Sequence, residues 1–199
     1  DTIKLLLELE VSGDQKAETG ATALHYAVKY AQPVTAGYLA RFMIENGSGN
    51  ANPEMVHVWT GEDLHKHKEA MNKDKPSDAD LKLRGWTPLH VAVHEGNARC
   101  GNALLAAKTD PNTRNGGKQT PLHLAISEGQ EDCATVLAKV ADLTIRDGDN
   151  NTPLQAALLR DDLTLAIEIA ANDPARKFDF VNEYRVTDLQ KLTLVHKAC

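Results

Sequence analysis

The feature that most constrains the fold of this chain is a six-residue motif that recurs along it. Its copies are "TALHYA" from Thr22, "TPLHVA" from Thr87, "TPLHLA" from Thr120, "TPLQAA" from Thr152 and "TLVHKA" from Thr193. Successive copies start 65, 33, 32 and 41 residues apart, so the basic period is close to 33 residues. Such a period is typical of arrays in which each unit buries its apolar face only against its neighbours. We therefore expect a stacked solenoid rather than one large core.

The clearest copies carry the signals of two short helices. Thr87 is suited to the N-cap of a first helix and Pro88 to its first position, where the missing N–H costs nothing. Gly96 and Gly129 are suited to the ends of first helices, because glycine accepts the left-handed conformation found there. Second helices are expected in "ARCGNALLAA" from Ala98 and in "EDCATVLAKV" from Glu131.

With this T-P-L-H-x-A core and this period, the chain resembles the ankyrin repeat family over most of its length. The resemblance implies an all-α ankyrin solenoid, in which helix-turn-helix repeats stack and β-hairpin-like fingers project. We expect a single ankyrin repeat domain over residues 1–199. Residues 1–10 look like the second helix of a repeat and residues 193–199 like the start of a first helix. The chain is therefore expected to be a fragment of a longer array.

Some residues depart from the family pattern. Gln155 replaces the motif histidine, so its repeat is expected to lose the usual imidazole hydrogen bonds. Lys118 and Asn150 occupy finger positions where the family prefers glycine, and lysine tolerates a positive φ less readily than asparagine. Because two glycines directly precede Lys118, we expect the turn of that finger to be reshaped.

Two stretches interrupt the period. Residues 48–80 are either an insertion with one extra helix over Glu62 to Asn72, capped by Thr60, or a degenerate repeat. Residues 174–186 are expected to form a long finger insertion, whose aromatic residues either cover the last repeat boundary or bind a partner.

Composition and charge exclude several classes of protein. The net charge of −6 argues against general nucleic-acid binding, and no apolar run is long enough to span a membrane. Cys100, Cys133 and Cys199 are an odd number of cysteines rather than a disulfide framework, and they read as small buried residues in a reducing compartment. We expect a monomer in the cytoplasm or nucleus.

No residue pattern points to catalysis, and we expect no enzyme activity, cofactor or metal. The cluster of His57, His65 and His67 lacks the i, i+4 pair of a helical zinc motif, and "RNGGKQT" lacks the first glycine of a phosphate-binding loop. In the resembled family the motif histidine holds adjacent repeats together. This structural role is expected for His25, His90, His123 and His196.

The resemblance implies a protein-interaction scaffold that binds a partner through its finger tips and the concave face of its first helices. Transferred position by position, the expected contact residues are Tyr30, Leu83, Arg84, Trp86, His94, Glu95, Arg114, Gln119, Ser127, Glu128, Arg146, Asp149, Asn151, Leu159 and Arg160. The arginines are expected to alternate with Glu95, Glu128 and Asp149 in a mixed-charge ladder. One alternative is a cytosolic inhibitor of a Rel-type transcription factor, which the acidic balance and "TPLQAALLR" loosely resemble. Another is a regulatory or substrate-docking arm of a larger enzyme or channel.

Trp86 is the favoured anchor, because tryptophan and arginine dominate interface hot spots. Its ring could instead fold onto a neighbour and cover the irregular segment. If Trp86 and Arg114 are exposed contact residues, Trp86→Ala and Arg114→Glu should weaken partner binding and leave thermal stability unchanged.

Overall fold

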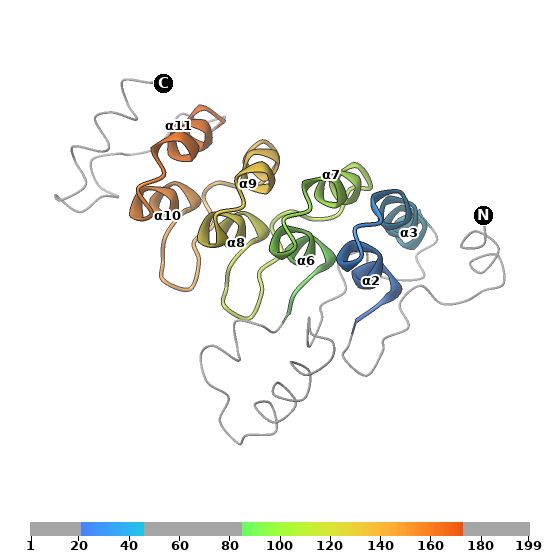
Figure 1. Cartoon of the computed structure of the whole chain (residues 1–199). Helices are drawn as coiled ribbons and strands as arrows, with labels where there is room; N and C mark the ends of the chain where they lie inside the picture. Colours follow the sequence, from blue (N-terminus) through green and yellow to red (C-terminus); the bar gives the residue numbers. More distant parts are fainter. Residues whose placement is uncertain (1–20, 46–84, 173–199) are drawn as a thin grey trace, which may run out of the picture.

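The computed structural model describes residues 21–45 and 85–172. Within these ranges the chain forms eight α-helices and no strand (Figure 1). The helices are α2 (Ala23–Lys29), α3 (Pro33–Glu45), α6 (Pro88–His94), α7 (Ala98–Ala106), α8 (Pro121–Glu128), α9 (Glu131–Ala138), α10 (Pro153–Leu159) and α11 (Leu163–Ala171).

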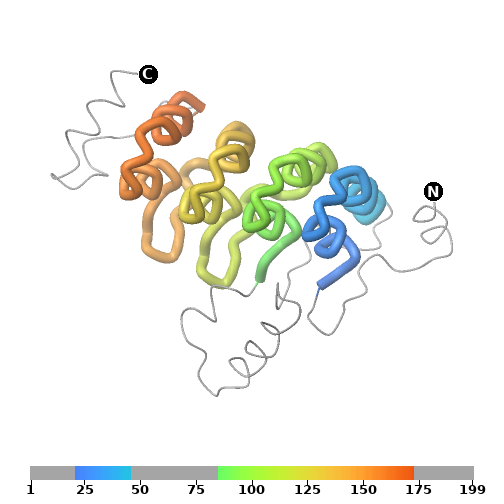
Figure 2. Tube along the Cα trace, viewed as in Figure 1, coloured from blue at the N-terminus to red at the C-terminus, as the bar shows by residue number. Residues whose placement is uncertain are grey.

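The helices lie in two rows. Figure 1 shows the first helices α2, α6, α8 and α10 in one row and the second helices α3, α7, α9 and α11 in the other. Each first helix packs against the second helix of its own repeat, and neighbouring first helices pack against each other from α2 to α10. The finger loops that precede α8 and α10 project on the side of the first row (Figure 2). The expected ankyrin-type solenoid is confirmed.

The stack is continuous across the longest gap between described residues. Helix α2 packs directly against α6, and α3 against α7, although residues 46–84 separate them in the sequence. The approach of α3 to α7 is close, since a Cβ built on Gly37 would lie 3.4 Å from the Cβ of Ala103. The choice between an insertion and a degenerate repeat at 48–80 falls outside the described residues. So do the expected finger insertion at 174–186 and both chain ends.

The core repeats with the sequence. Each first helix buries a motif leucine and, three residues later, an alanine small enough to let the neighbouring helix approach. These residues are Leu24, Leu89, Leu122 and Leu154, and Ala27, Ala92, Ala125 and Ala157. Cys100 and Cys133 are buried free thiols at matching positions of α7 and α9. Burial raises the pKa of the Cys133 thiol to about 11, so it stays protonated at neutral pH and packs as a small apolar group.

First helices start and end as the sequence predicts. Threonine N-caps precede α2, α6, α8 and α10, and proline occupies the first position of the last three. Gly96 and Gly129 have φ values of 62° and 72°, which confirms the predicted left-handed ends. The same position of the other two repeats holds Ala31 and Asp161, at φ values of 53° and 61°. Stacking therefore requires this conformation whether or not the residue is glycine.

The prediction of a reshaped finger turn at Lys118 is wrong. Lys118 itself has a φ of 58°, matching Asn150 at 66°. The Lys118 N–H donates to the Asn115 carbonyl at 2.8 Å, as the Asn150 N–H does to the Asp147 carbonyl at 3.2 Å. Neighbouring fingers touch here, since a Cβ on Gly148 would lie 2.7 Å from the carbonyl oxygen of Gly117. Finger-to-finger packing thus overrides the conformational preference of lysine.

Replacing Lys118 with glycine should therefore stabilise the fold. A left-handed non-glycine residue costs about 1–2 kcal/mol, and glycine regains most of this despite its greater unfolded-state entropy. We expect Lys118→Gly to raise the free energy of unfolding in urea by about 0.5–1 kcal/mol. The control is Lys139→Gly at a φ of −81°, which should lower it. Equal effects at the two lysines would contradict this interpretation.

Candidate functional site

The motif histidines are held in one tautomer by the threonine three residues before them. The backbone N–H groups of Thr22 and Thr87 donate to Nδ1 of His25 and His90, each at 3.2 Å. Because an N–H must donate, Nδ1 of each ring accepts and Nε2 carries the proton. The threonine hydroxyl lies 2.9 Å from the same Nδ1 in both repeats.

The protonated Nε2 of each histidine reaches the finger of the next repeat. It donates to the backbone carbonyl directly before the next motif threonine, at 3.3 Å from His25 to Trp86, 3.1 Å from His90 to Gln119 and 3.1 Å from His123 to Asn151. All three rings are buried. The expected structural role is confirmed for these three histidines; His196 lies outside the described residues.

Burial fixes the charge of these rings. Desolvation lowers the pKa of His90 to about 4 and also lowers that of His123, against hydrogen bonds to carbonyls that act in the opposite direction. The His90 and His123 rings are therefore neutral at physiological pH, and both nitrogens of His90 are hydrogen-bonded. They hold the repeats in register rather than transfer protons.

Gln155 retains the cap part of this arrangement. Its Oε1 accepts from the backbone N–H of Thr152 at 2.8 Å, so the amide replaces Nδ1 of the histidine. The same oxygen accepts from Nη1 of Arg146 at 3.1 Å. The predicted loss of the imidazole is thus accompanied by a retained cap and by a new contact to the finger.

Trp86 lies inside the molecule, so the prediction of an exposed anchor is wrong. Only 3% of its surface is exposed, and its ring lies edge-on to the His94 imidazole with centroids 5.1 Å apart. The His90 ring is also near, at 6.4 Å. Trp86→Ala would remove core packing and lower stability, contrary to the sequence-based expectation.

The arginines of the fingers brace the backbone. Arg114 donates from Nε to the Lys118 carbonyl at 3.0 Å and from Nη2 to the Arg146 carbonyl of the next finger at 2.8 Å. Arg146 donates from Nη1 to the Asn150 carbonyl at 2.9 Å. These contacts are to backbone carbonyls, so Arg114→Glu would disturb the finger itself.

The ends of the first helices form a second set of links, which we call the helix-end row. It consists of the last two side chains before each left-handed residue: Lys29 and Tyr30, His94 and Glu95, Ser127 and Glu128, Leu159 and Arg160. Nδ1 of His94 lies 3.0 Å from Oε1 of Glu128, and Nη1 of Arg160 donates to the Ser127 carbonyl at 2.6 Å. In both links, the first residue of the helix-end pair in one repeat (His94 or Ser127) contacts the second residue of the pair in the next repeat (Glu128 or Arg160). Sequence reasoning identified these residues but not their pairing, since pairing depends on which repeats are adjacent.

The remaining predicted contact residues divide by position. Glu95, Asp149 and Tyr30 are exposed, and Gln119 and Asn151 are half-buried in the fingers. Leu83 and Arg84 lie outside the described residues.

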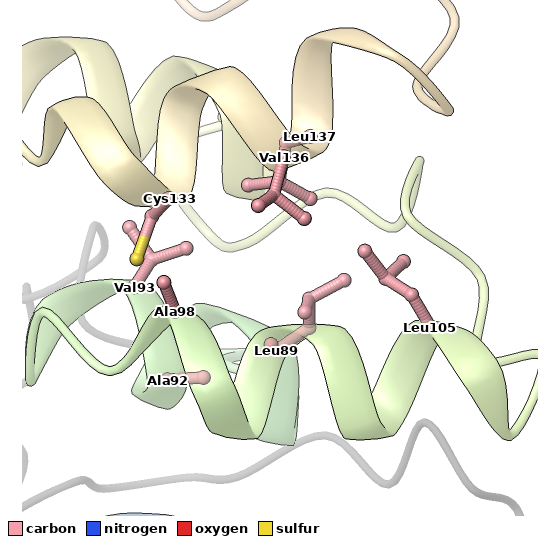
Figure 3. Close-up of a pocket in the computed structure, with 9 residues that line it drawn as sticks. Leu89, Ala92, Val93, Ala98, Leu105, Cys133, Val136 and Leu137 are labelled. Carbon is pink, nitrogen blue, oxygen red and sulfur yellow. The ribbon is translucent and has the colours of Figure 1, made fainter.

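A small apolar hollow lies between α7 and α9, where side chains of both helices face each other (Figure 3). It encloses about 200 Å³, including space open to solvent. Its lining is Leu89, Ala92, Val93, Ala98, Gly101, Leu105, Cys133, Val136 and Leu137. Ligand sites are typically larger and place a few polar groups inside, so this hollow reads as incomplete packing.

Residues 21–45 and 85–172 contain neither a cluster suited to a metal ion nor a helix suited to a membrane. No cluster of three histidine, cysteine or carboxylate side chains in this part of the chain could hold a metal ion. None of the described helices has the length and apolar character needed to cross a membrane.

The neutral histidines should make stability depend on pH. The unfolded His90 binds a proton near its usual pKa of 6.5, whereas the folded one resists protonation down to about 4. Stability from this ring is therefore complete above 6.5 and lost as pH falls toward 4. We expect the contribution of His90 to the free energy of unfolding to fall by about 2 kcal/mol between about pH 7.5 and about pH 5.

The His90→Gln variant isolates this effect, because Gln155 shows that glutamine preserves the threonine cap. At about pH 7.5 it should be less stable by about 1–2 kcal/mol, since the Gln119 carbonyl loses its donor. Its stability should change less with pH than that of the wild type. An unchanged pH dependence would assign the effect to other groups.

Gly101 offers a second stability test. A Cβ built there meets nothing within 4 Å, and the residue lies inside α7. Gly101→Ala should raise the free energy of unfolding by about 1 kcal/mol through helix propensity and partial filling of the hollow. The free energy is measured by urea unfolding. If the variant is less stable than the wild type, the space next to Gly101 does not accommodate a methyl group.

Comparison with known proteins agrees with this geometry. A family model of ankyrin repeats in three copies matches residues 1–147 and 103–177. No curated protein matches the chain significantly. Ankyrin repeats are in general protein–protein interaction modules. The matched residues cover most of the chain and include all four described helix pairs; the chain belongs to the ankyrin repeat family.

Proposed function

We propose that this chain is a non-catalytic scaffold that binds a partner protein through its fingers and its helix-end row. The observation that carries the proposal is a contrast within the repeats. Buried positions of the first helices hold the same residue types from repeat to repeat, but the first helix-end position differs in every repeat and the second holds tyrosine, glutamate, glutamate and arginine in order. Different side chains that follow one another along one edge of the stack form a distinctive pattern of charged and apolar groups. Such a pattern is suited to recognising the complementary surface of one particular partner protein.

The helix-end row has apolar anchors at both ends. Tyr30 is 63% exposed in the first described repeat, and Leu159 is 64% exposed in the last. Tyr30 is also preorganised, because its ring stacks on Tyr26 with centroids 6.5 Å apart. Between these anchors lie the exposed carboxylates of Glu95 and Glu128. Apolar anchors supply most affinity in protein interfaces, while the charges between them select the partner.

The internal residues support this surface rather than form it. Trp86 packs beneath His94, and Arg114 and Arg146 hold the finger backbones together. The proposed contact residues are therefore Tyr30, His94, Glu95, Ser127, Glu128, Asp149, Leu159 and Arg160.

The test is a quantitative pull-down that compares two surface variants with the wild type. Tyr30→Ser combined with Leu159→Ser should abolish capture of the partner, because both anchors are lost. Val34→Ser is the matched control, since Val34 is 86% exposed but lies on α3 in the other row of helices. It should leave capture unchanged.

Thermal unfolding of both variants is measured alongside. We expect midpoints close to that of the wild type, because exposed side chains contribute little to stability. Undiminished capture by the double variant, or equal loss in Val34→Ser, would refute binding at the helix-end row.

A further inference from the structure

His94 differs from the motif histidines in its surroundings. It is the last residue of α6, and its side chain is 29% exposed, against 28% for its partner Glu128 at the end of α8. Nδ1 of His94 lies 3.0 Å from the Glu128 carboxylate, so the pair joins the second and third described repeats. The same junction one repeat later uses the Arg160 guanidinium and the Ser127 carbonyl, without a histidine.

The His94 ring is held in place from inside. The Trp86 ring lies edge-on to it at 5.1 Å, and Trp86 is fixed in turn by the hydrogen bond from His25 to its carbonyl. Three charged groups act on the ring among the described residues: Glu128 on α8, Glu95 at the end of its own helix and Lys29 on α2. The two carboxylates favour the charged imidazole and Lys29 opposes it, with Glu128 the strongest because it also hydrogen-bonds.

We propose that His94 is a proton-sensitive link between two repeats, which strengthens its bond to Glu128 when the imidazole is charged and thereby regulates the helix-end row. When His94 is neutral, the link is an ordinary hydrogen bond and Glu128 presents its full negative charge. When His94 is charged, the link becomes an ion pair and that charge is compensated.

The direction of the pH dependence follows from the partners. Hydrogen bonding and the charge of Glu128 raise the pKa of His94 above its usual 6.5, despite partial burial. The stabilisation from this pair is therefore complete below 6.5 and is lost as pH rises through the raised pKa. This is opposite in sign to His90, so the two kinds of histidine respond to pH in different ranges.

The consequence for a partner rests on the proposed function. A partner that places a lysine or arginine against Glu128 should bind more weakly as pH falls, because His94 then competes for the same carboxylate. The link itself is a property of this chain alone, so it can be tested without the partner.

The experiment is an NMR titration of the imidazole Cε1–H signals in the folded chain. His94 should titrate at a higher pH than free histidine, while His90 should stay neutral through the same range. Glu128→Gln should lower the His94 midpoint. Glu95→Gln is the matched control: it removes a neighbouring carboxylate that has no hydrogen bond to the ring and should lower the midpoint less.

Trp86→Phe tests the positioning of the ring. It keeps an aromatic ring at this site, and a shifted His94 midpoint in a folded variant would show that Trp86 orients the imidazole. An unchanged midpoint in Glu128→Gln, or equal shifts in Glu128→Gln and Glu95→Gln, would overturn the link. Partner capture is measured on the same variants to separate the two claims. If His94 titrates as expected but capture does not change with pH, only the regulation of binding is refuted.

Discussion

The stack depends on one hydrogen-bonded unit that is repeated from helix to helix. A threonine caps the first helix and directs its N–H at Nδ1 of the histidine, which forces the proton onto Nε2. That proton then bonds the carbonyl at the start of the next repeat. Helix capping, tautomer and repeat register are therefore set by the same side chain. Because the bond lies in the buried interior, leaving its carbonyl unpaired would cost far more than an exposed bond contributes.

Register between repeats in turn imposes the backbone conformation of the loops. Ala31 and Asp161 adopt the left-handed conformation that glycine adopts in the other two repeats, and Lys118 does so in its finger. Each is locally unfavourable, but the neighbouring repeat fixes the path of the chain on both sides. The conformational preference of a single residue is therefore a weak predictor of the backbone where stacking determines the path of the chain. The finger turn at Lys118, which keeps the same conformation as the turn at Asn150, is an example.

The same register separates supporting residues from surface residues. Trp86 and the finger arginines look exposed in the sequence pattern, yet Trp86 packs against His94 of its own repeat, and Arg114 bonds one carbonyl of its own finger and one of the next. The helix-end row remains at the surface, and two of its side chains, His94 and Arg160, bond groups of the neighbouring repeat. His94 and Glu128 therefore belong to the proposed binding surface and also connect two adjacent repeats.

The sequence by itself determined the fold class, the helix starts at each threonine, the glycine ends of α6 and α8 and the structural role of the motif histidines. The fold class and the helix starts and ends follow from local signals repeated at a fixed period, whereas the role of the motif histidines was implied by the resemblance to the ankyrin repeat family. Only the tertiary structure decided that Trp86 is buried, that Arg114 and Arg146 brace fingers, that Gln155 retains the cap and that His94 meets Glu128. The Arg114 bond to the next finger and the His94–Glu128 pair join residues about one period apart in sequence, and the pattern within a single repeat does not encode such contacts. The Trp86–His94 contact and the Gln155 cap lie within one repeat and depend on side-chain orientations that the residue pattern does not specify.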